Sequence, residues 1–166
     1  PPPPPFYRPA PHRELHRPRR RQRQMCIRDS LLALSSFKFK KGSEIITPNL
    51  TFSTTVAPIY QLGLIPHFVG AEENKFLTDT NQIEKCINSK TVSLMIPNLL
   101  GNIADWKKIY KIAKKYKLKV IEDSADTIGY TYKNKNLGKY SDISTNSMYA
   151  SHIITGCLLY TSDAAD

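Results

Sequence analysis

Residues 30–156 contain no arginine, because all eight arginines of this 166-residue chain lie between residues 8 and 28. Eight of the twelve prolines fall in the first eighteen positions, so the composition changes near residue 30. Cysteine is also scarce, with three in the chain, and no apolar run reaches the ~20 residues that a membrane-spanning helix needs. These absences argue against a disulfide framework, a zinc site and a membrane helix.

The two ends of the chain can be encoded by one DNA segment read on opposite strands. Suitable codons for CLLYTSDAAD (157–166) give, as their reverse complement, a reading frame for RQRQMCIRD (21–29). This segment resembles the adapter of a transposase-based sequencing library. We therefore expect residues 1–29 to be non-native and disordered, residues 157–166 to be a non-native tail, and residues 30–156 to be a natural fragment.

The positive charge has a simple explanation once the ends are set aside. The chain carries a net charge of +10, and its basic run RPRRRQRQ (17–24) lies in the expected non-native part. Residues 30–156 hold sixteen lysines against ten acidic residues, which we interpret as a solvated surface and not as a nucleic-acid interface. Cys86 is then the one native cysteine, which suits a reducing cytoplasm.

Hydrophobic periodicity predicts alternating strands and helices. Residues 92–98 (VSLMIPN) are almost wholly apolar, as in a strand covered on both faces, whereas residues 102–117 carry one apolar stripe opposite lysines. Such alternation predicts an α/β fold with a mostly parallel sheet and helices on both faces. The expected strands are 44–49, 65–70, 92–98, 118–123 and 142–149. One helix is expected to end at residue 37, and three more are expected at 51–63, 80–89 and 102–117. Thr51 and Asn102 are the expected helix caps, and Gly63 the expected helix end.

Ligands of such sheets bind beyond the carboxyl ends of the strands, so the residues there are candidates for a site. They are Asn49, Thr51, Phe52, Glu122, Asp123, Asp126, Ser147 and His152. No GxGxxG or GxxxxGK[ST] motif follows a strand, so a dinucleotide or P-loop site is unsupported.

Three stretches resemble consecutive motifs of the DegT/DnrJ/StrS family of sugar aminotransferases. They are GSEIITPNLTF (42–52), VIEDSADTIG (120–129) and SMYASH (147–152). The resemblance covers nearly all of residues 30–156 and implies part of the large domain of a fold-type-I, pyridoxal-phosphate-dependent enzyme. It also implies a nucleotide-sugar substrate and a homodimer when the protein is full length.

The resemblance implies roles for four cofactor-binding residues. Asp123 matches the aspartate that faces the pyridine nitrogen, where a carboxylate keeps the ring protonated as an electron sink. Asp126 matches the position that reaches the ring hydroxyl, Phe52 the aromatic stacked on the ring, and Ser147 the serine that binds the phosphate. Without the motifs, Asp123 would indicate a solvated acid and Asp126 the cap of a helix or turn. Phe52 would indicate core packing, and Ser147 a surface position.

His152 stands where the aminotransferases keep the lysine that binds the cofactor covalently, and histidine cannot form that bond. Within this family, such a histidine implies a sugar 3-dehydrase that uses pyridoxamine phosphate on an NDP-4-keto-6-deoxyhexose in deoxysugar or lipopolysaccharide biosynthesis. There it is a catalytic base, for which an imidazole titrating near neutrality is suited. Outside that context, a lone histidine indicates a satisfied core residue.

Two alternatives stay open. A conventional sugar-nucleotide aminotransferase is disfavoured because no lysine follows Lys139, and a catalytically inactive homologue is compatible with the same motifs. Ala125 occupies the position of the first cluster cysteine in iron–sulfur 3-dehydrases, which argues against a cluster. The truncated chain itself is expected to be inactive, and no metal ligands are assigned.

Overall fold

The computed structural model describes residues 28–73 and 75–147. Five of its strands form one sheet in the order β2-β1-β3-β4-β7, and every pairing within this sheet is parallel. This confirms the predicted mostly parallel α/β sheet. The strands are β1 (Glu44–Pro48), β2 (Ile65–Val69), β3 (Thr91–Pro97), β4 (Lys119–Asp123) and β7 (Ile143–Thr145).

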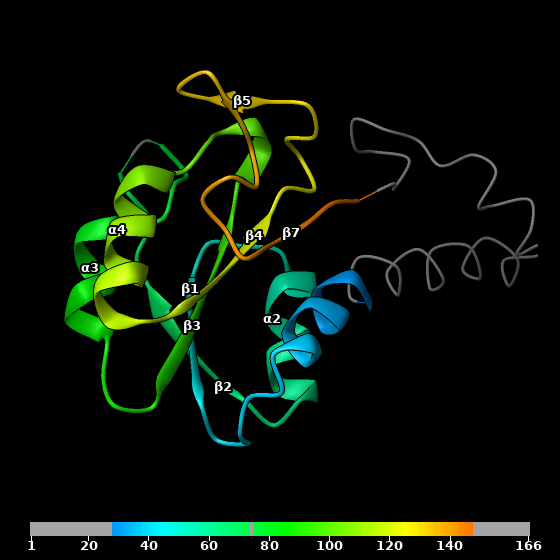
Figure 1. Cartoon of the computed structure of the whole chain (residues 1–166), viewed down its shortest axis with the longest axis vertical. Helices are drawn as coiled ribbons and strands as arrows, with labels where there is room; N and C mark the ends of the chain where they lie inside the picture. Colours follow the sequence, from blue (N-terminus) through cyan, green and yellow to red (C-terminus); the bar gives the residue numbers. More distant parts are fainter. Residues whose placement is uncertain (1–27, 74, 148–166) are drawn as a thin grey trace, which may run out of the picture.

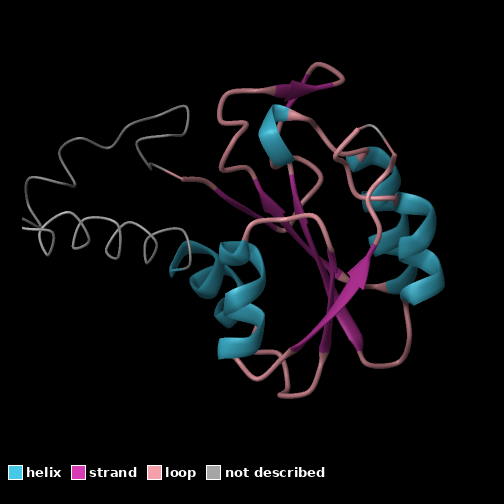
Figure 2. Cartoon of the chain, turned by 180° about the vertical axis from the view of Figure 1, so that it is seen from behind, coloured by secondary structure: helices cyan, strands magenta, loops and turns pink. Residues whose placement is uncertain are grey.

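Helices cover both faces of the sheet. The helical residues 28–36 and α2 (Ser53–Gln61) lie on one side, and α3 (Thr80–Cys86) and α4 (Trp106–Tyr116) lie on the other (Figures 1 and 2). The helices α2, α3 and α4 each join two strands that run parallel to one another, as in crossover connections. The predicted elements are therefore present, with most ends shifted by one to four residues.

Two apolar clusters fill the spaces between the sheet and its helices. Adjacent strand residues alternate between them: Leu94 packs toward α4, and Met95 packs toward α2. β4 does the same with Val120 and Ile121. This two-sided burial explains why β3 has no polar face in the sequence.

The helix α4 begins later than the sequence suggests. Asp105 is its N-cap, and one carboxylate oxygen accepts from the Lys108 amide at 3.3 Å. The prediction that Asn102 caps this helix is wrong, because the Asn102 amide group instead donates to the carbonyl oxygen of Leu99 at 3.2 Å. The apolar stripe is confirmed for Trp106 and Ile109, which are fully buried.

The helix α2 begins at Ser53 with Phe52 as its N-cap, and no side chain caps it. The prediction that Thr51 caps this helix is therefore wrong by one residue. Gly63 has φ of 68° directly after the helix C-cap, so its predicted role at the helix end is confirmed.

A small antiparallel pair, β5 (Thr131–Tyr132) and β6 (Lys135–Asn136), was not predicted. Lys133 and Asn134 join its strands with φ of 50° and 60°, as in a type I′ turn. The Tyr132 hydroxyl donates to Asp105 at 2.6 Å, which ties the hairpin to the start of α4. Strands of two residues carry too little periodicity to be read from sequence.

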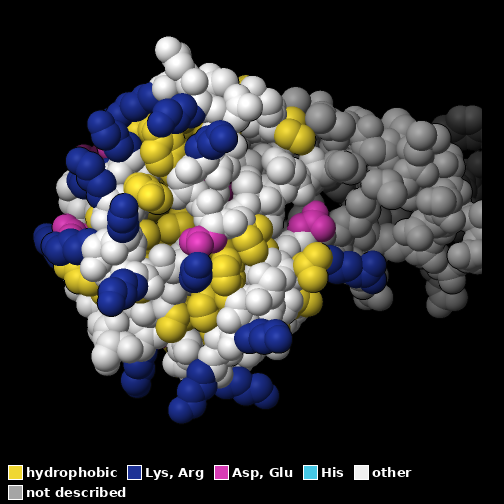
Figure 3. Space-filling model, viewed as in Figure 1, with side chains coloured by type: hydrophobic (Ala, Val, Ile, Leu, Met, Phe, Trp, Pro, Cys, Tyr) yellow, Lys and Arg dark blue, Asp and Glu magenta, His cyan; other side chains and the backbone are white. Residues whose placement is uncertain are grey.

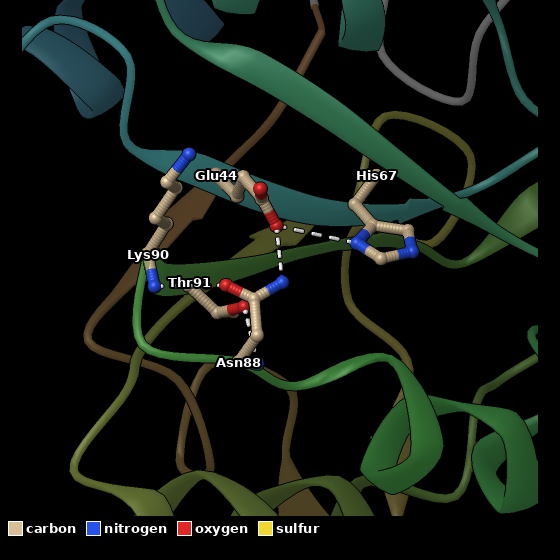
Figure 4. A network of polar contacts seen from close by, with 5 residues as sticks. All are labelled: Glu44, His67, Asn88, Lys90 and Thr91. Atoms are coloured by element: carbon tan, nitrogen blue, oxygen red, sulfur yellow. Dashed lines mark hydrogen bonds and ion pairs between the residues drawn. The ribbon is translucent and has the colours of Figure 1, made fainter.

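A polar network closes the amino ends of β1 and β3 (Figure 4). Glu44 accepts from the Asn88 side-chain amide at 2.7 Å and lies 3.3 Å from the His67 ring nitrogen Nδ1. The hydrogen bond from Asn88 is the main cause that lowers the pKa of Glu44. This network lies at the amino ends of the strands, opposite to the candidate site described below.

Basic side chains are spread over the face of the molecule in Figure 3, with apolar and uncharged areas between them. On α4 the lysines occupy the side away from the sheet, and Lys107, Lys111 and Lys114 are exposed. This distribution is the one expected of a solvated polar helix face.

We expect Ile109→Ala to lower the free energy of unfolding by about 2–5 kcal/mol, because Ile109 is fully buried between α4 and the sheet. Urea denaturation followed by circular dichroism measures the loss. Lys111→Ala on the exposed face of the same helix is the matched control, and its effect should stay within about 0.5 kcal/mol. Equal effects of the two substitutions would contradict the packing described here.

The cap of α3 gives a pH-dependent prediction. Asp79 accepts from the Asn81 backbone amide at 2.9 Å, and this bond is the main cause that lowers the pKa of Asp79 from its ordinary value of 3.8. Because the pKa of Asp79 is lowered in the folded state, the stabilisation from this cap is fully present above the ordinary value of 3.8. It is lost as the pH falls through the folded-state pKa. Asp79→Ala should therefore cost about 1 kcal/mol near neutral pH and much less in acid. A cost that does not change with pH would contradict this assignment.

Candidate active site at the carboxyl edge of the sheet

The carboxyl ends of β3, β4 and β7 lie side by side at one edge of the sheet. Pro97 pairs with Asp123, and Asp123 pairs with Thr145, so the three strands end in register. β1 runs parallel to β3 and ends at the same edge with Pro48. Ligands of open parallel sheets bind beyond this edge, which makes it the candidate site.

Asp123, the last residue of β4, is held in place by two donors from different elements. The Thr55 hydroxyl in the first turns of α2 donates to its Oδ2 at 2.8 Å, and the Ala125 amide donates to Oδ1 at 3.3 Å. Asp123 is only half-buried, so its carboxylate is fixed and still borders solvent. A fixed carboxylate at a strand end is suited to face a positively charged ring nitrogen.

Phe52 leads into the helix that holds Asp123. Its carbonyl oxygen accepts from the Thr55 amide at 3.0 Å, so Phe52 and the Thr55 hydroxyl belong to one backbone turn. The Phe52 side chain is 51% exposed, although aromatic rings usually bury most of their surface. The adjacent Thr51 hydroxyl is buried and has no hydrogen-bond partner among the residues that the structure describes. An exposed aromatic ring leaves a face on which an aromatic ligand could stack.

Asp126 connects the loops that follow β3 and β4. Its Oδ2 accepts from the Leu100 amide at 3.1 Å, and Leu100 adopts φ of 54° and ψ of 34°. A left-handed conformation is uncommon for leucine and is found where surrounding structure enforces it. Asp126 thus helps to shape the loop beyond β3.

Ser147 follows β7 by two residues and is 3% exposed. It therefore lies just beyond the carboxyl end of β7, which is shorter than the expected strand 142–149. His152 lies outside the described residues, so its placement stays a prediction. The structure brings Phe52, Asp123, Asp126 and Ser147 to the same edge of the sheet, and their roles toward a cofactor also stay predictions.

A second carboxylate lies near Asp123. Partial burial raises the pKa of Asp29, and the negative charge of Asp123 raises it further. Asp29 belongs to the segment predicted to be non-native, so this repulsion would not belong to the natural site. Ligand-binding tests are therefore better made on full-length protein.

Three residues at this edge were not singled out from sequence. Thr55 holds Asp123, the Leu100 amide donates to Asp126, and Asn98 donates its amide to the Asp123 carbonyl oxygen at 2.9 Å. Of these three residues, only Asn98 could have been identified from the sequence, because it is a polar residue directly after an apolar strand. The others act through contacts between segments that no local pattern specifies.

No helix in residues 28–73 or 75–147 is long and apolar enough to cross a bilayer. The same residues contain no group of three or more histidine, cysteine, aspartate or glutamate side chains placed to hold a metal ion.

An open parallel sheet with helices on both faces and polar residues at its carboxyl edge defines a ligand-binding α/β domain. Residues 28–163 match the DegT/DnrJ/EryC1/StrS aminotransferase family. The chain belongs to this family, which confirms the resemblance read from the motifs.

The relatives that the chain resembles include proteins named as sugar dehydratases and as aminotransferases. A lipopolysaccharide biosynthesis protein of Salmonella typhimurium is 40% identical over 131 residues, which are 76% of this chain and 30% of the relative. The GDP-perosamine synthase of Escherichia coli O157:H7 is 36% identical over 135 residues, covering 80% of this chain and 37% of that protein.

A solved structure shows the same architecture. It is the E. coli GDP-4-keto-6-deoxy-D-mannose 3-dehydratase with bound hydrated pyridoxal phosphate, which is 30% identical with a TM-score of 0.71. The match covers 78% of this chain and 34% of that one. The chain thus spans about a third of the length of these relatives.

Thr55→Val should destabilise the protein by about 1.5–3 kcal/mol, because Asp123 loses a hydroxyl donor while the side-chain volume is kept. Thr55→Ser, which keeps the hydroxyl, should cost less. Thermal denaturation of both variants makes the comparison. If valine is tolerated as well as serine, the Thr55 hydroxyl does not hold Asp123.

Proposed function

We propose that residues 30–156 are a fragment of a longer cytoplasmic enzyme, and that residues 1–29 and 157–166 are not native. The shared coding of the two ends and the partial coverage of the relatives support this proposal. The statements that follow concern the full-length enzyme, which we propose to be a homodimer.

The proposed cofactor is pyridoxal phosphate or pyridoxamine phosphate, and the described residues fit it. Asp123 would face the ring nitrogen, Phe52 would stack on the ring, Asp126 would reach the ring hydroxyl, and Ser147 would bind the phosphate. The fixed, half-buried Asp123 carboxylate and the exposed Phe52 ring are the structural observations that support this fit. When bound, the cofactor would supply an electron sink for proton removal and elimination at carbon.

The proposed reaction is removal of the C3 hydroxyl from an NDP-4-keto-6-deoxyhexose. The observation that carries this choice is His152 in the SMYASH motif, together with the absence of any lysine after Lys139. An imidazole at this position would take and return protons near neutral pH without binding the cofactor covalently. A 3-dehydratase among the relatives supports the choice. Ala125 favours an enzyme without an iron–sulfur cluster.

The alternative is a sugar-nucleotide aminotransferase. The similarity to a GDP-perosamine synthase supports it, and the missing lysine disfavours it. A catalytically inactive homologue is the third interpretation of the same motifs. These three possibilities differ in which form of the cofactor the protein binds and in whether the cofactor is attached covalently.

The test uses full-length protein and its His152→Lys variant. The wild type should bind pyridoxamine phosphate reversibly and should retain no pyridoxal phosphate after borohydride reduction. The His152→Lys variant should gain covalently attached pyridoxal phosphate, because a lysine amine in this slot can react with the aldehyde. Absorbance spectroscopy and mass spectrometry after reduction detect the difference.

Two results would contradict the proposal. A wild type that ignores pyridoxamine phosphate in a binding titration would leave only the inactive homologue. Covalent cofactor on the wild type would indicate an aminotransferase with a lysine elsewhere. Lys139→Arg in the wild-type background is the matched control, since Lys139 is the last lysine before the motif and its loss should change neither result.

A further inference from the structure

Glu122 is a fully buried carboxylate that has no place in the proposed reaction. It precedes Asp123 in β4, and its side chain lies on the opposite face of the sheet, because it pairs with Ile96 in the cluster on the α4 side. Glutamate is almost never fully buried without partners, since an unpaired charge in the interior is costly. The contacts of this side chain therefore need an explanation.

Four donors surround the carboxylate. Oε1 accepts from the Asn98 side-chain amide at 3.0 Å and from the Ser124 hydroxyl at 2.6 Å. Oε2 accepts from the Gly138 backbone amide at 2.9 Å and from the Ser141 hydroxyl at 3.2 Å. Each oxygen thus has two donors, which compensates for the loss of water.

These donors follow the carboxyl ends of β3 and β4 and precede the amino end of β7. Asn98 directly follows β3, Ser124 directly follows β4, and residues 138–141 lead into β7. One side chain therefore fixes the relative positions of the strands that carry Asp123 and Ser147. Burying such a network adds little net stability compared with an apolar core, but it allows only one arrangement of its members.

Asn98 has no freedom to reorient within the network. Its Oδ1 accepts from the Ala104 amide at 3.1 Å and from the Trp106 indole nitrogen at 2.9 Å, so its Nδ2 must face Glu122. Its backbone amide donates to the carbonyl oxygen of Asp123. The orientation of Asn98 thus links the buried carboxylate to the backbone of Asp123.

We propose that Glu122 is a positioning residue that holds the ends of β3, β4 and β7 in the geometry that the site requires. The inference rests on the proposed function, because it assigns to Glu122 the task of placing Asp123 and Ser147 toward the cofactor. Glu122 itself acts from the other face of the sheet and touches neither cofactor nor substrate.

Glutamine cannot replace this glutamate. A glutamine side chain has one acceptor oxygen and one NH₂ group, whereas the Asn98 Nδ2 and the Gly138 amide can only donate. Either orientation of glutamine therefore sets two donors against each other. Glu122→Gln keeps the size of the side chain, but it replaces the carboxylate by an amide with one acceptor oxygen and one donor group.

Asp142→Asn is the matched control. The Asp142 carboxylate also joins β4 to the segment before β7, since it accepts from the Val120 amide at 2.9 Å and from Lys119 Nζ at 2.7 Å. It lies at the amino end of β4, away from the candidate site, and both contacts are partly exposed. Each variant thus turns one carboxylate into an amide: Glu122 lies near the carboxyl end of β4, and Asp142 contacts the amino end of the same strand from the segment before β7.

The first measurement is hydrogen exchange of full-length protein, read on peptides that contain Asn98 and Ser124. Both amides donate across strand ends, Asn98 to Asp123 and Ser124 to Thr145. Glu122→Gln should accelerate their exchange about tenfold, and Asp142→Asn should leave it within about twofold of the wild type. Unchanged protection in Glu122→Gln would overturn the inference, whether or not the protein binds a cofactor.

The second measurement is a fluorescence titration of the same proteins with pyridoxamine phosphate. Glu122→Gln should raise the Kd about 10- to 100-fold, the size seen when groups that orient ligand-binding side chains are lost. Asp142→Asn should bind as the wild type does. Wild-type affinity in Glu122→Gln would reduce Glu122 to a stabilising role and overturn the inference. If the wild type itself does not bind, the proposed function fails, and the exchange result alone decides whether Glu122 orders the strand ends.

Discussion

The parallel pairing of β3, β4 and β7 is the constraint on which the candidate site depends. Because Pro97, Asp123 and Thr145 are in register, the residues that follow these strands meet at one edge of the sheet. Burial on both faces specifies that register, since a slip of one residue would turn each apolar side chain toward the wrong cluster. The packing of the core and the geometry of the site are thus set by the same contacts.

Two consecutive carboxylates of β4 serve the two faces of the sheet. Asp123 lies on the side of α2, where Thr55 holds it and solvent still reaches it. Glu122 lies on the side of α4, where it is sealed from water among four donors. The alternation of side chains along a strand therefore places a group that can meet a ligand next to a group that can order the strand ends.

The parallel sheet and its helices on both faces could be predicted from the sequence, because they follow from local periodicity. The motifs placed Phe52, Asp123, Asp126 and Ser147 near the carboxyl ends of strands, whereas their roles toward a cofactor stay predictions. The contact between Thr55 and Asp123 spans 68 residues and could not be predicted, since no local pattern specifies which distant hydroxyl meets a strand end. The cap at Asn102 was predicted wrongly because Asp105, three residues later, caps α4 instead. The cap at Thr51 was predicted wrongly because α2 begins after Phe52 with no side-chain cap. The hairpin β5–β6 was missed because its strands have two residues each.

A crystal structure of the full-length protein with pyridoxamine phosphate tests the central claim most directly. The account predicts the Asp123 carboxylate within hydrogen-bond distance of the ring nitrogen, the Phe52 ring against one face of the cofactor, and His152 close to the reacting carbon. A cofactor bound elsewhere, or a ring nitrogen that faces solvent while Asp123 contacts only Thr55 and the Ala125 amide, would contradict the account.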